Sequence, residues 1–118
     1  MNNDIVNSLP SAEVYQSDKL AGYLQEDSDG FWLFTYEDGY KGAPVSLTLP
    51  IRKESYMFEE FPPAFEGLLP EGPQLEALLK KHKIDRRDAF TQLVMVGKDL
   101  VGSLSVCLPK STKSKENQ

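Results

Sequence analysis

The proline-rich stretch between Phe61 and Leu79 is the strongest constraint on the fold of this chain. In FPPAFEGLLPEGPQLEALL, the segment LLPEGP separates two apolar helical patterns. Pro70 and Gly72 break any helix that they enter, so the chain must turn there. Such a corner is either buried within one domain or presented as a shaped surface to another molecule. The residues alone leave both alternatives open.

The residues before this stretch carry the signals of β-strands. Residues 13–27, EVYQSDKLAGYLQED, have two short apolar runs split by SDK, which predicts a hairpin, and the following DSDG predicts a turn. The aromatic run FWLFTY suits a third strand. In VSLTLP, apolar and polar residues alternate, which predicts a strand with Val45, Leu47 and Leu49 on one face. The first half therefore predicts a small antiparallel, partly barrel-like sheet.

The second half changes to a helical period. A short helical turn is predicted at 64–68, and Pro73 is expected to open a helix with Leu75, Leu78 and Leu79 on its buried side. These leucines have the spacings of three and four residues that share one helix face.

A third helix is predicted after Asp85, which is expected to be its N-cap, with Asp88 standing in for the glutamate of a capping box. Gly97 is expected to close it, and LVGSLSVCL returns to a strand pattern. The inward side of the helix is expected to carry Phe90, Leu93 and Val94. The fold class is thus predicted to be α+β, with about three short helices in the second half.

Length and charge limit the classes of protein that this chain can belong to. Its 118 residues suit one domain, which we expect at 12–109, between a flexible segment at 1–11 and a disordered tail at 110–118. The net charge of -5 disfavours direct binding of nucleic acid. Cys107 is the only cysteine, so no intramolecular disulfide can form. No run of residues is apolar and long enough to cross a membrane, so we expect a cytoplasmic protein.

The sequence contains few candidates for catalytic residues or metal ligands. His82, the only histidine, has no evident serine, cysteine or histidine partner and is interpreted as a helix-end residue at the edge of the core. GKDLVGS lacks the residue order of a phosphate-binding loop. A group of glutamates is more typical of solvated helix starts than of an acid–base pair or metal site: Glu59, Glu60, Glu66 and Glu71. We therefore expect no catalytic residue, metal ligand or cofactor, although a small hydrolase using His82 and these acids is the enzyme-class alternative.

Large apolar side chains crowd the region before the corner. A domain of this size cannot easily bury all of them. The sequence is equally compatible with a binding site for a partner and with the core of the domain, and it favours neither alternative. The residues are Tyr56, Met57, Phe58, Phe61, Phe65, Leu68 and Leu69. The one basic cluster is interpreted as a solvated face or as a contact with an acidic partner: Lys80, Lys81, Lys83, Arg86 and Arg87.

The order of these motifs resembles the N-terminal subdomain of the HipA kinases of bacterial toxin–antitoxin systems. VYQSDKLAGYL, VSLTLPI, FEGLLPEG and DAFTQLVMVGKDLVGSLSV are similar to it over about Val14–Val106. LLPEG together with VGKDLVGSL at this separation makes the resemblance specific. Ser103 replaces the alanine that is usual in the family, and the loop between Tyr36 and Pro44 is shorter than in full-length kinases.

The resemblance implies a partner rather than an activity. The glycine-rich ATP loop, catalytic aspartate and metal-binding aspartate of full kinases have no counterpart in this sequence, so we expect no kinase activity. A separate copy of this lobe is similar to the HipS antitoxins, which act with a kinase, HipT, that lacks the lobe and with a DNA-binding protein, HipB. The implied function is inhibition of a HipT-like kinase, with a HipB-like protein as a possible third component; a structural subunit that completes the kinase is the alternative. The implied partner-binding residues are Phe61, Phe65, Leu68, Leu69, Pro70, Glu71 and Gly72.

Overall fold

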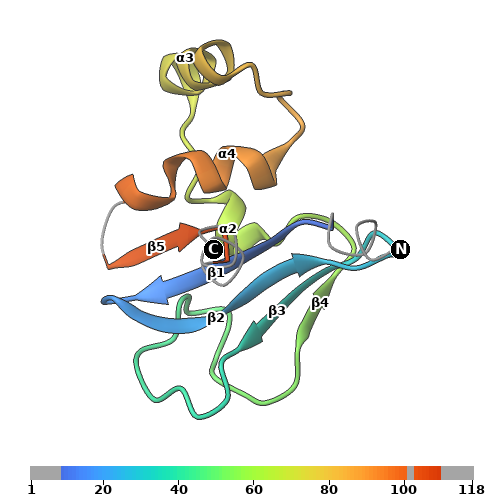
Figure 1. The fold of residues 1–118 in the computed structure, drawn as a ribbon, viewed down its shortest axis with the longest axis vertical. Helices are drawn as coiled ribbons and strands as arrows, with labels where there is room; N and C mark the ends of the chain where they lie inside the picture. The colour runs from blue at the N-terminus through green and yellow to red at the C-terminus, as the bar shows by residue number, and fades with distance from the viewer. Residues whose placement is uncertain (1–8, 101–102, 110–118) are drawn as a thin grey trace, which may run out of the picture.

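A computed structural model describes residues 9–100 and 103–109 of the chain. Its strands form one antiparallel sheet in the order β4-β3-β2-β1-β5, and the sheet is open along both edges (Figure 1). This confirms the predicted α+β class. The strands are β1 Ser11–Gln16, β2 Lys19–Glu26, β3 Trp32–Tyr36, β4 Tyr56–Phe58 and β5 Leu104–Cys107. The helices are α2 Pro63–Glu66, α3 Gly72–His82 and α4 Ala89–Val96, with a 3-10 turn at Gly97–Asp99.

The predicted hairpin is confirmed as β1 and β2. Ser17 and Asp18 connect them with φ of 52° and 68°, the left-handed pair of a two-residue turn that matches the twist of the strands. The predicted turn at DSDG follows β2. There the carboxylate of Asp27 accepts hydrogen bonds from the backbone N–H groups of Asp29 at 2.9 Å and Phe31 at 3.0 Å.

The core lies between one face of the sheet and the helices α2 and α4. From α2, Phe65 packs against Phe34 of β3 with ring centroids 5.4 Å apart. From α4, Leu93 is fully buried, as predicted, and Phe90 and Val94 are partly buried beside it. Burial of these large side chains is the main stabilising contribution of the domain.

The predicted strand at VSLTLP is wrong. Residues 45–49 form a turn, in which the N–H of Leu49 donates to the carbonyl of Ser46 at 3.0 Å. The hydroxyl of the buried Tyr36 accepts from the N–H of Val45 at 3.0 Å and donates to the carbonyl of Leu49. Because a side chain satisfies these backbone groups, no strand partner is needed. Val45 and Leu49 are buried on either side, whereas Leu47 is 99% exposed.

A strand that the sequence reading missed takes the position beside β3. Tyr56–Phe58 forms β4, with Phe58 opposite Trp32 and Tyr56 opposite Phe34. The sequence predicts a crowd of large apolar side chains at these residues but no strand. Met57 points away from the core and is exposed, as one face of an edge strand allows.

The helices follow the predicted order but not every predicted boundary. α2 covers Pro63–Glu66 and α3 begins at Gly72. The prediction of Asp85 as N-cap of the last helix is wrong, because the carboxylate of Asp88 accepts from the N–H of Thr91 at 3.1 Å and caps α4. The carboxylate of Asp85 instead accepts from the N–H of Arg87 at 2.7 Å, within the loop before α4.

Gly97 follows α4, as expected. A glycine is needed there for close packing and not for a left-handed cap. Its φ is -56°, in the right-handed helical region. A Cβ atom built at this position would lie 1.8 Å from the carbonyl oxygen of Val106. Glycine therefore lets the end of α4 touch the backbone of β5, which pairs with β1 and confirms the predicted last strand.

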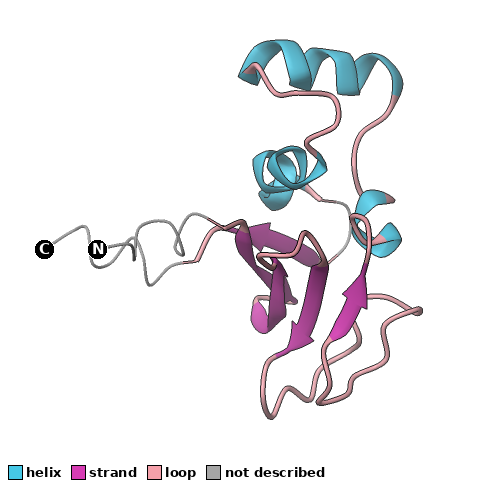
Figure 2. Cartoon of the chain, turned by 90° about the vertical axis from the view of Figure 1, so that its right-hand side faces the viewer, coloured by secondary structure: helices cyan, strands magenta, loops and turns pink. Residues whose placement is uncertain are grey.

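Helix α3 stands farther from the sheet than α4 in both views (Figures 1 and 2). Its one buried residue is Leu79, which is 9% exposed. The prediction that His82 borders the core is wrong: the side chain is exposed at the end of α3, because this helix has little core to border. No helix among the described residues is long and apolar enough to span a membrane. The predicted tail at 110–118 lies outside the described residues, as does 1–8 of the predicted flexible segment, whereas Ser11 already belongs to β1.

Candidate partner-binding groove

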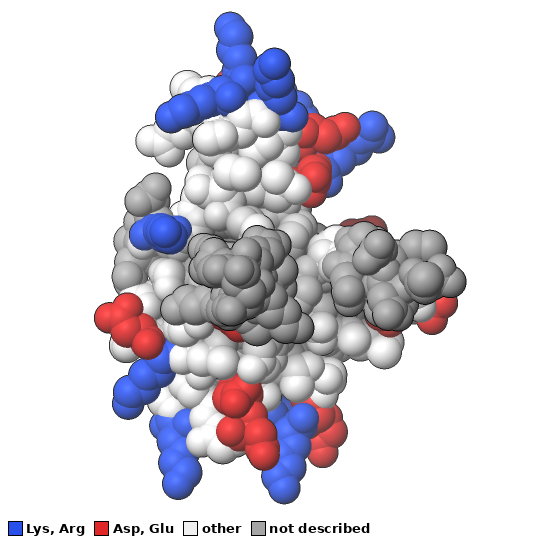
Figure 3. Space-filling model, viewed as in Figure 1, with Lys and Arg blue, Asp and Glu red and all other residues white. Residues whose placement is uncertain are grey.

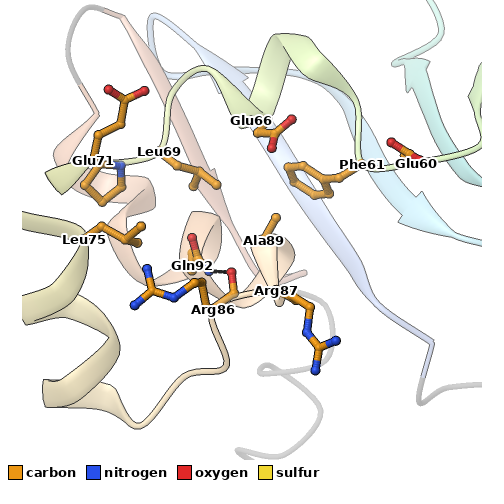
Figure 4. Close-up of a pocket in the computed structure, with 11 residues that line it drawn as sticks. Glu60, Phe61, Glu66, Leu69, Glu71, Leu75, Arg86, Arg87, Ala89 and Gln92 are labelled. Atoms are coloured by element: carbon orange, nitrogen blue, oxygen red, sulfur yellow. Dashed lines mark hydrogen bonds between the residues drawn. The ribbon is translucent and has the colours of Figure 1, made fainter.

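An open groove of about 690 Å³ lies between the corner that joins α2 to α3 and the start of α4 (Figure 4). Most of its apolar lining comes from one stretch of the sequence, residues 61–75. Phe61 precedes α2, Leu69 belongs to the corner, and Leu75 lies on α3. Ala89 adds a methyl group from the first turn of α4. Six of the eleven lining residues are charged or polar, so the groove offers both apolar and polar contacts to a bound molecule.

The two sides of the groove carry opposite charges. Glu60, Glu66 and Glu71 lie on the side of the corner, whereas Arg86 and Arg87 lie on the side of the loop before α4 (Figure 4). A bound segment would therefore meet carboxylates along one edge and guanidinium groups along the other. This polarity favours one orientation of a charged ligand over its reverse.

Closely spaced turns make the corner stiff. The carbonyl of Pro62 accepts from the N–H groups of Phe65 and Glu66, each at 3.0 Å, and the N–H of Leu69 donates to the carbonyl of Glu66 at 3.1 Å. Gly72 then adopts a φ of 61°, a left-handed conformation that a residue with a Cβ rarely takes. A segment held in this way loses little conformational entropy when it binds a partner.

Stacked aromatic rings support one end of the groove. The ring of Phe61 meets the indole of Trp32 edge to face, with centroids 5.1 Å apart and an interplanar angle of 82°. Trp32 also stacks on Phe90 of α4 at 5.6 Å. Because β3 and α4 both contribute to this arrangement, the position of Phe61 is fixed by the body of the domain.

A buried glutamine fixes the opposite wall. Gln92 of α4 is 3% exposed, and its Nε2 donates to the backbone carbonyls of Asp85 at 3.3 Å and Arg86 at 2.9 Å. The guanidinium of Arg86 in turn contacts both carboxylate oxygens of Glu76 on α3, each at 2.8 Å. This hydrogen-bonded pair lowers the pKa of Glu76 and raises that of Arg86. The loop is therefore tied to both α4 and α3.

The structure brings together four of the seven residues that the sequence assigned to partner binding: Phe61, Leu69, Pro70 and Glu71. Gly72 lies next to them at the exposed start of α3, and Leu68 is partly buried against the core. Phe65 is different, because it is 1% exposed and its side chain belongs to the core. A side chain so fully covered has no surface to offer a partner, and we leave Phe65 out of the groove.

The wall opposite the corner was not predicted as part of the site. The sequence predicts only a basic cluster for Arg86 and Arg87, and it predicts no role for Ala89 or Gln92. Gln92 carried a usable signal, since it is a polar residue within the apolar run AFTQLVMV. The approach of this wall to the corner depends on how α4 packs on the sheet, which no local pattern encodes.

The described residues that line the groove include no histidine, cysteine, serine or lysine. Its lining holds carboxylates, guanidinium groups and one amide, whereas His82 lies at the far end of α3 and Cys107 is half-buried in β5. Nucleophilic catalysis needs a nucleophile within reach of a base. Across the described ranges, no three His, Cys, Asp or Glu side chains are grouped so that they could hold a metal ion.

Comparisons with known proteins agree on one family. Residues 12–107 match the model of the HipA N-terminal domain. The chain is 31% identical over 96 residues to an uncharacterized protein of Haemophilus influenzae, a match that covers 81% of this chain and 90% of that protein. It is 28% identical over 97 residues to the putative kinase Y4mE of Sinorhizobium fredii, covering 79% of this chain but only 23% of the relative. A solved structure of the N-terminal domain of HipA toxin superposes with a TM-score of 0.64 at 30% identity, covering 82% of this chain and 90% of that one.

Proposed function

Because the chain belongs to the HipA N-terminal domain family, we propose that it is an antitoxin that binds and inhibits a HipT-like serine/threonine kinase toxin. It acts in the cytoplasm, where such a kinase meets ATP, and resembles the HipS component of three-component systems. A HipB-like DNA-binding protein is the candidate third member of the complex. The kinase docks at the groove beside the corner of residues 68–72.

The observation that carries this proposal is the position of the corner. The segment FEGLLPEG, on which the resemblance to HipA depends, lies at the rim of an open groove whose lining is partly apolar and partly charged. In the putative kinase of Sinorhizobium fredii, the region similar to this chain makes up 23% of the protein, so the domain there belongs to a longer chain. A kinase that lacks such a domain can dock on this one at the groove.

We further propose that the chain has no catalytic activity of its own. The family match is to the N-terminal domain and not to a catalytic domain. Phosphoryl transfer needs groups that clamp the nucleotide, bind metal and position the nucleophile. The purified chain is therefore expected not to hydrolyse ATP or phosphorylate protein, and ATP-dependent phosphorylation by the chain alone would contradict this.

Inhibition follows if the domain binds an inactive conformation of the kinase more tightly than the active one. A bound protein shifts a conformational equilibrium only by the difference between its affinities for the two states. The stiff corner suits this role, because it can hold the N-terminal lobe of the kinase away from its active geometry without occupying the substrate site.

A substitution in the groove tests the docking site. Leu69→Asp places a carboxylate between Glu66 and Glu71, and Met57→Asp makes the same chemical change at an exposed residue of β4 outside the groove. Binding of each variant to a HipT-like kinase from the same genome is measured by calorimetry, with melting temperatures as the folding control. We expect Leu69→Asp to weaken binding at least about tenfold and Met57→Asp to bind like the unmodified chain. Equal affinity of all three proteins would contradict the groove as the docking site.

A structural subunit that completes the kinase without inhibiting it is the second candidate function. The occurrence of the domain within the putative kinase of Sinorhizobium fredii favours it, since there the two parts belong to one chain. Kinase activity measured with increasing amounts of this chain separates the two functions. An antitoxin lowers phosphorylation and restores growth of cells that express the kinase, whereas a completing subunit leaves both unchanged or raises activity.

A further inference from the structure

The charge of this protein is unevenly distributed. The chain carries a net charge of -5, yet residues 80–87 hold five cationic side chains and one carboxylate. In the space-filling view, Lys and Arg gather over α3 and the loop after it, whereas they alternate with Asp and Glu at the opposite end of the molecule (Figure 3). An acidic protein thus has one strongly basic end. We call Lys80, Lys81, Lys83 and Arg87 the basic patch.

The cations of the basic patch are largely unneutralised. Arg86 is paired with Glu76, whereas the side chain of Arg87 is 92% exposed and its Nε lies 3.7 Å from the Asp85 carboxylate. Lys80, Lys81 and Lys83 are exposed, and none of them forms an ion pair with another described residue. Unlike Arg86, these four side chains can meet a partner without first breaking a close ion pair.

Stabilisation of α3 accounts for only part of the patch. Three lysines follow Leu79 in the last turn and at the C-cap, where cations interact favourably with the helix dipole. That dipole amounts to about half a negative charge at the helix end. One lysine would offset it, so most of the positive charge remains available to another molecule.

The basic patch continues the groove. Arg87 lines the groove and also belongs to the patch, while Leu75 of the groove and Lys80 of the patch lie on the same helix. Arg87 therefore joins the groove to the basic patch at the loop before α4. Lys80 and Lys81 follow Leu75 by five and six residues, so they point about 140° and 120° around α3 from it. The opposite rim carries Glu60, Glu66 and Glu71, which would repel an extended polyanion laid across the groove.

We propose that this surface binds an acidic segment of the partner kinase, an inference that rests on the proposed function. The segment places an apolar side chain against Leu69 and Leu75 and a carboxylate over Arg87, and the lysines attract its further carboxylates. A short acidic peptide segment satisfies both features, because it can end before the acidic rim. Nucleic acid fits less well, since its charge continues along the whole strand.

A charged patch of this kind raises the rate at which the two proteins associate and orients the partner, more than it adds to the free energy of the bound complex. It is screened by salt, since the Debye length falls from about 10 Å at 0.1 M to about 3 Å at 1 M. The apolar contacts in the groove have no such dependence. Binding to the kinase should therefore combine a salt-sensitive part from the patch with a salt-insensitive part from the groove.

A pair of matched triple variants tests the inference. The first, Lys80→Gln with Lys81→Gln and Lys83→Gln, removes the lysines of the patch and keeps good helix-forming residues. The control, Lys19→Gln with Lys41→Gln and Lys53→Gln, removes three exposed lysines outside the patch, so both variants have the same net charge. Affinity for the HipT-like kinase is measured at 50 mM and 500 mM NaCl, with circular dichroism to show that α3 remains folded.

We expect the patch variant to bind about tenfold more weakly than the unmodified chain at 50 mM NaCl and to approach it at 500 mM. The control should stay within about twofold at both salts. Equal affinity of the patch variant and the control would overturn the inference and leave the groove as the docking site. If the unmodified chain binds no kinase at either salt, the proposed function fails and the inference fails with it. Binding of a fluorescent 20-base-pair DNA duplex at 150 mM NaCl, lost only in the patch variant, would also overturn it in favour of nucleic acid.

Discussion

The sheet and helix α3 are held in place by different means. In the sheet, Val14, Leu24 and Phe34 are fully buried and belong to one continuous core with α2 and α4. Along α3, only Leu79 is buried. Polar contacts hold α3 and the loop after it in place. These are the Glu76–Arg86 pair and the hydrogen bonds from Gln92 to the loop. The sheet therefore determines whether the domain folds, and α3 determines what one wall of the groove presents.

The comparison implies that substitutions in the two regions move different equilibria. Loss of a core side chain changes the free energy of unfolding and affects binding only through the amount of folded protein. Loss of a contact along α3 changes the local order of the groove wall with little effect on global unfolding. Four predictions follow this division, in order of decreasing effect on stability.

Truncation of Phe65 is expected to have the largest effect. Its ring is buried between α2 and Phe34, so Phe65→Ala should lower the free energy of unfolding by about 3–5 kcal/mol. Urea denaturation measures this directly. The folded fraction of the variant should still bind the kinase with the affinity of the unmodified chain. A variant that melts normally but binds weakly would place Phe65 at the interface and contradict its assignment to the core.

The turn at residues 45–49 allows the same comparison within a few residues. Leu49→Ala should lower the free energy of unfolding by about 2–5 kcal/mol, because Leu49 is buried beside Tyr36. Leu47→Ala should change it by less than about 0.5 kcal/mol, since Leu47 is fully exposed. Both variants remove the same atoms of a leucine side chain, so each is the control for the other. Similar losses in both would mean that the segment packs as a strand after all.

Removal of the Gln92 amide tests the connection between the two regions. Gln92→Ala leaves the carbonyls of Asp85 and Arg86 without their donor, at an expected cost of about 1–3 kcal/mol. Amide hydrogen exchange should accelerate in the loop at 85–88 and in α3 more than in the sheet. Uniform acceleration across the sheet would show that α3 belongs to the same cooperative unit.

The smallest effect is expected from Glu76, and it should depend on pH. The hydrogen bond from Arg86 holds the pKa of Glu76 below its ordinary value of 4.5. A carboxyl group whose folded pKa is lowered stabilises the folded form above its unfolded pKa, and that contribution is lost as the pH falls through the folded value. NMR titration of Glu76 should therefore give a midpoint below 4.5, and Arg86→Gln should bring it back toward 4.5. An unchanged midpoint in that variant would remove Arg86 as the cause.

The sequence predicted local elements well where local chemistry determines them. The turn at Ser17 and Asp18 and the proline-bounded corner both follow from backbone preferences of a few residues. The strand predicted from the alternation of Val45, Leu47 and Leu49 is wrong. The hydroxyl of Tyr36 forms hydrogen bonds with the backbone of Val45 and Leu49, which in a strand would bond to a neighbouring strand. The corner side of the groove was predicted through the family motif. Its other wall depends on the contacts of Gln92 with the carbonyls of Asp85 and Arg86 and of Arg86 with Glu76. These residues are close in sequence, but their contacts form only once α3, the following loop and α4 have packed together.

The order of the strands has a consequence for the synthesis of the protein. β5 pairs with β1, so the last strand of the domain completes the edge of the first, with Cys107 opposite Glu13. While the ribosome delivers β1 to β4, one edge of β1 has no partner within the chain. An open edge of this kind can pair with strands of other nascent chains. Completion of the domain therefore waits for its final strand, and a nascent chain that stops before β5 has a sheet edge prone to aggregation.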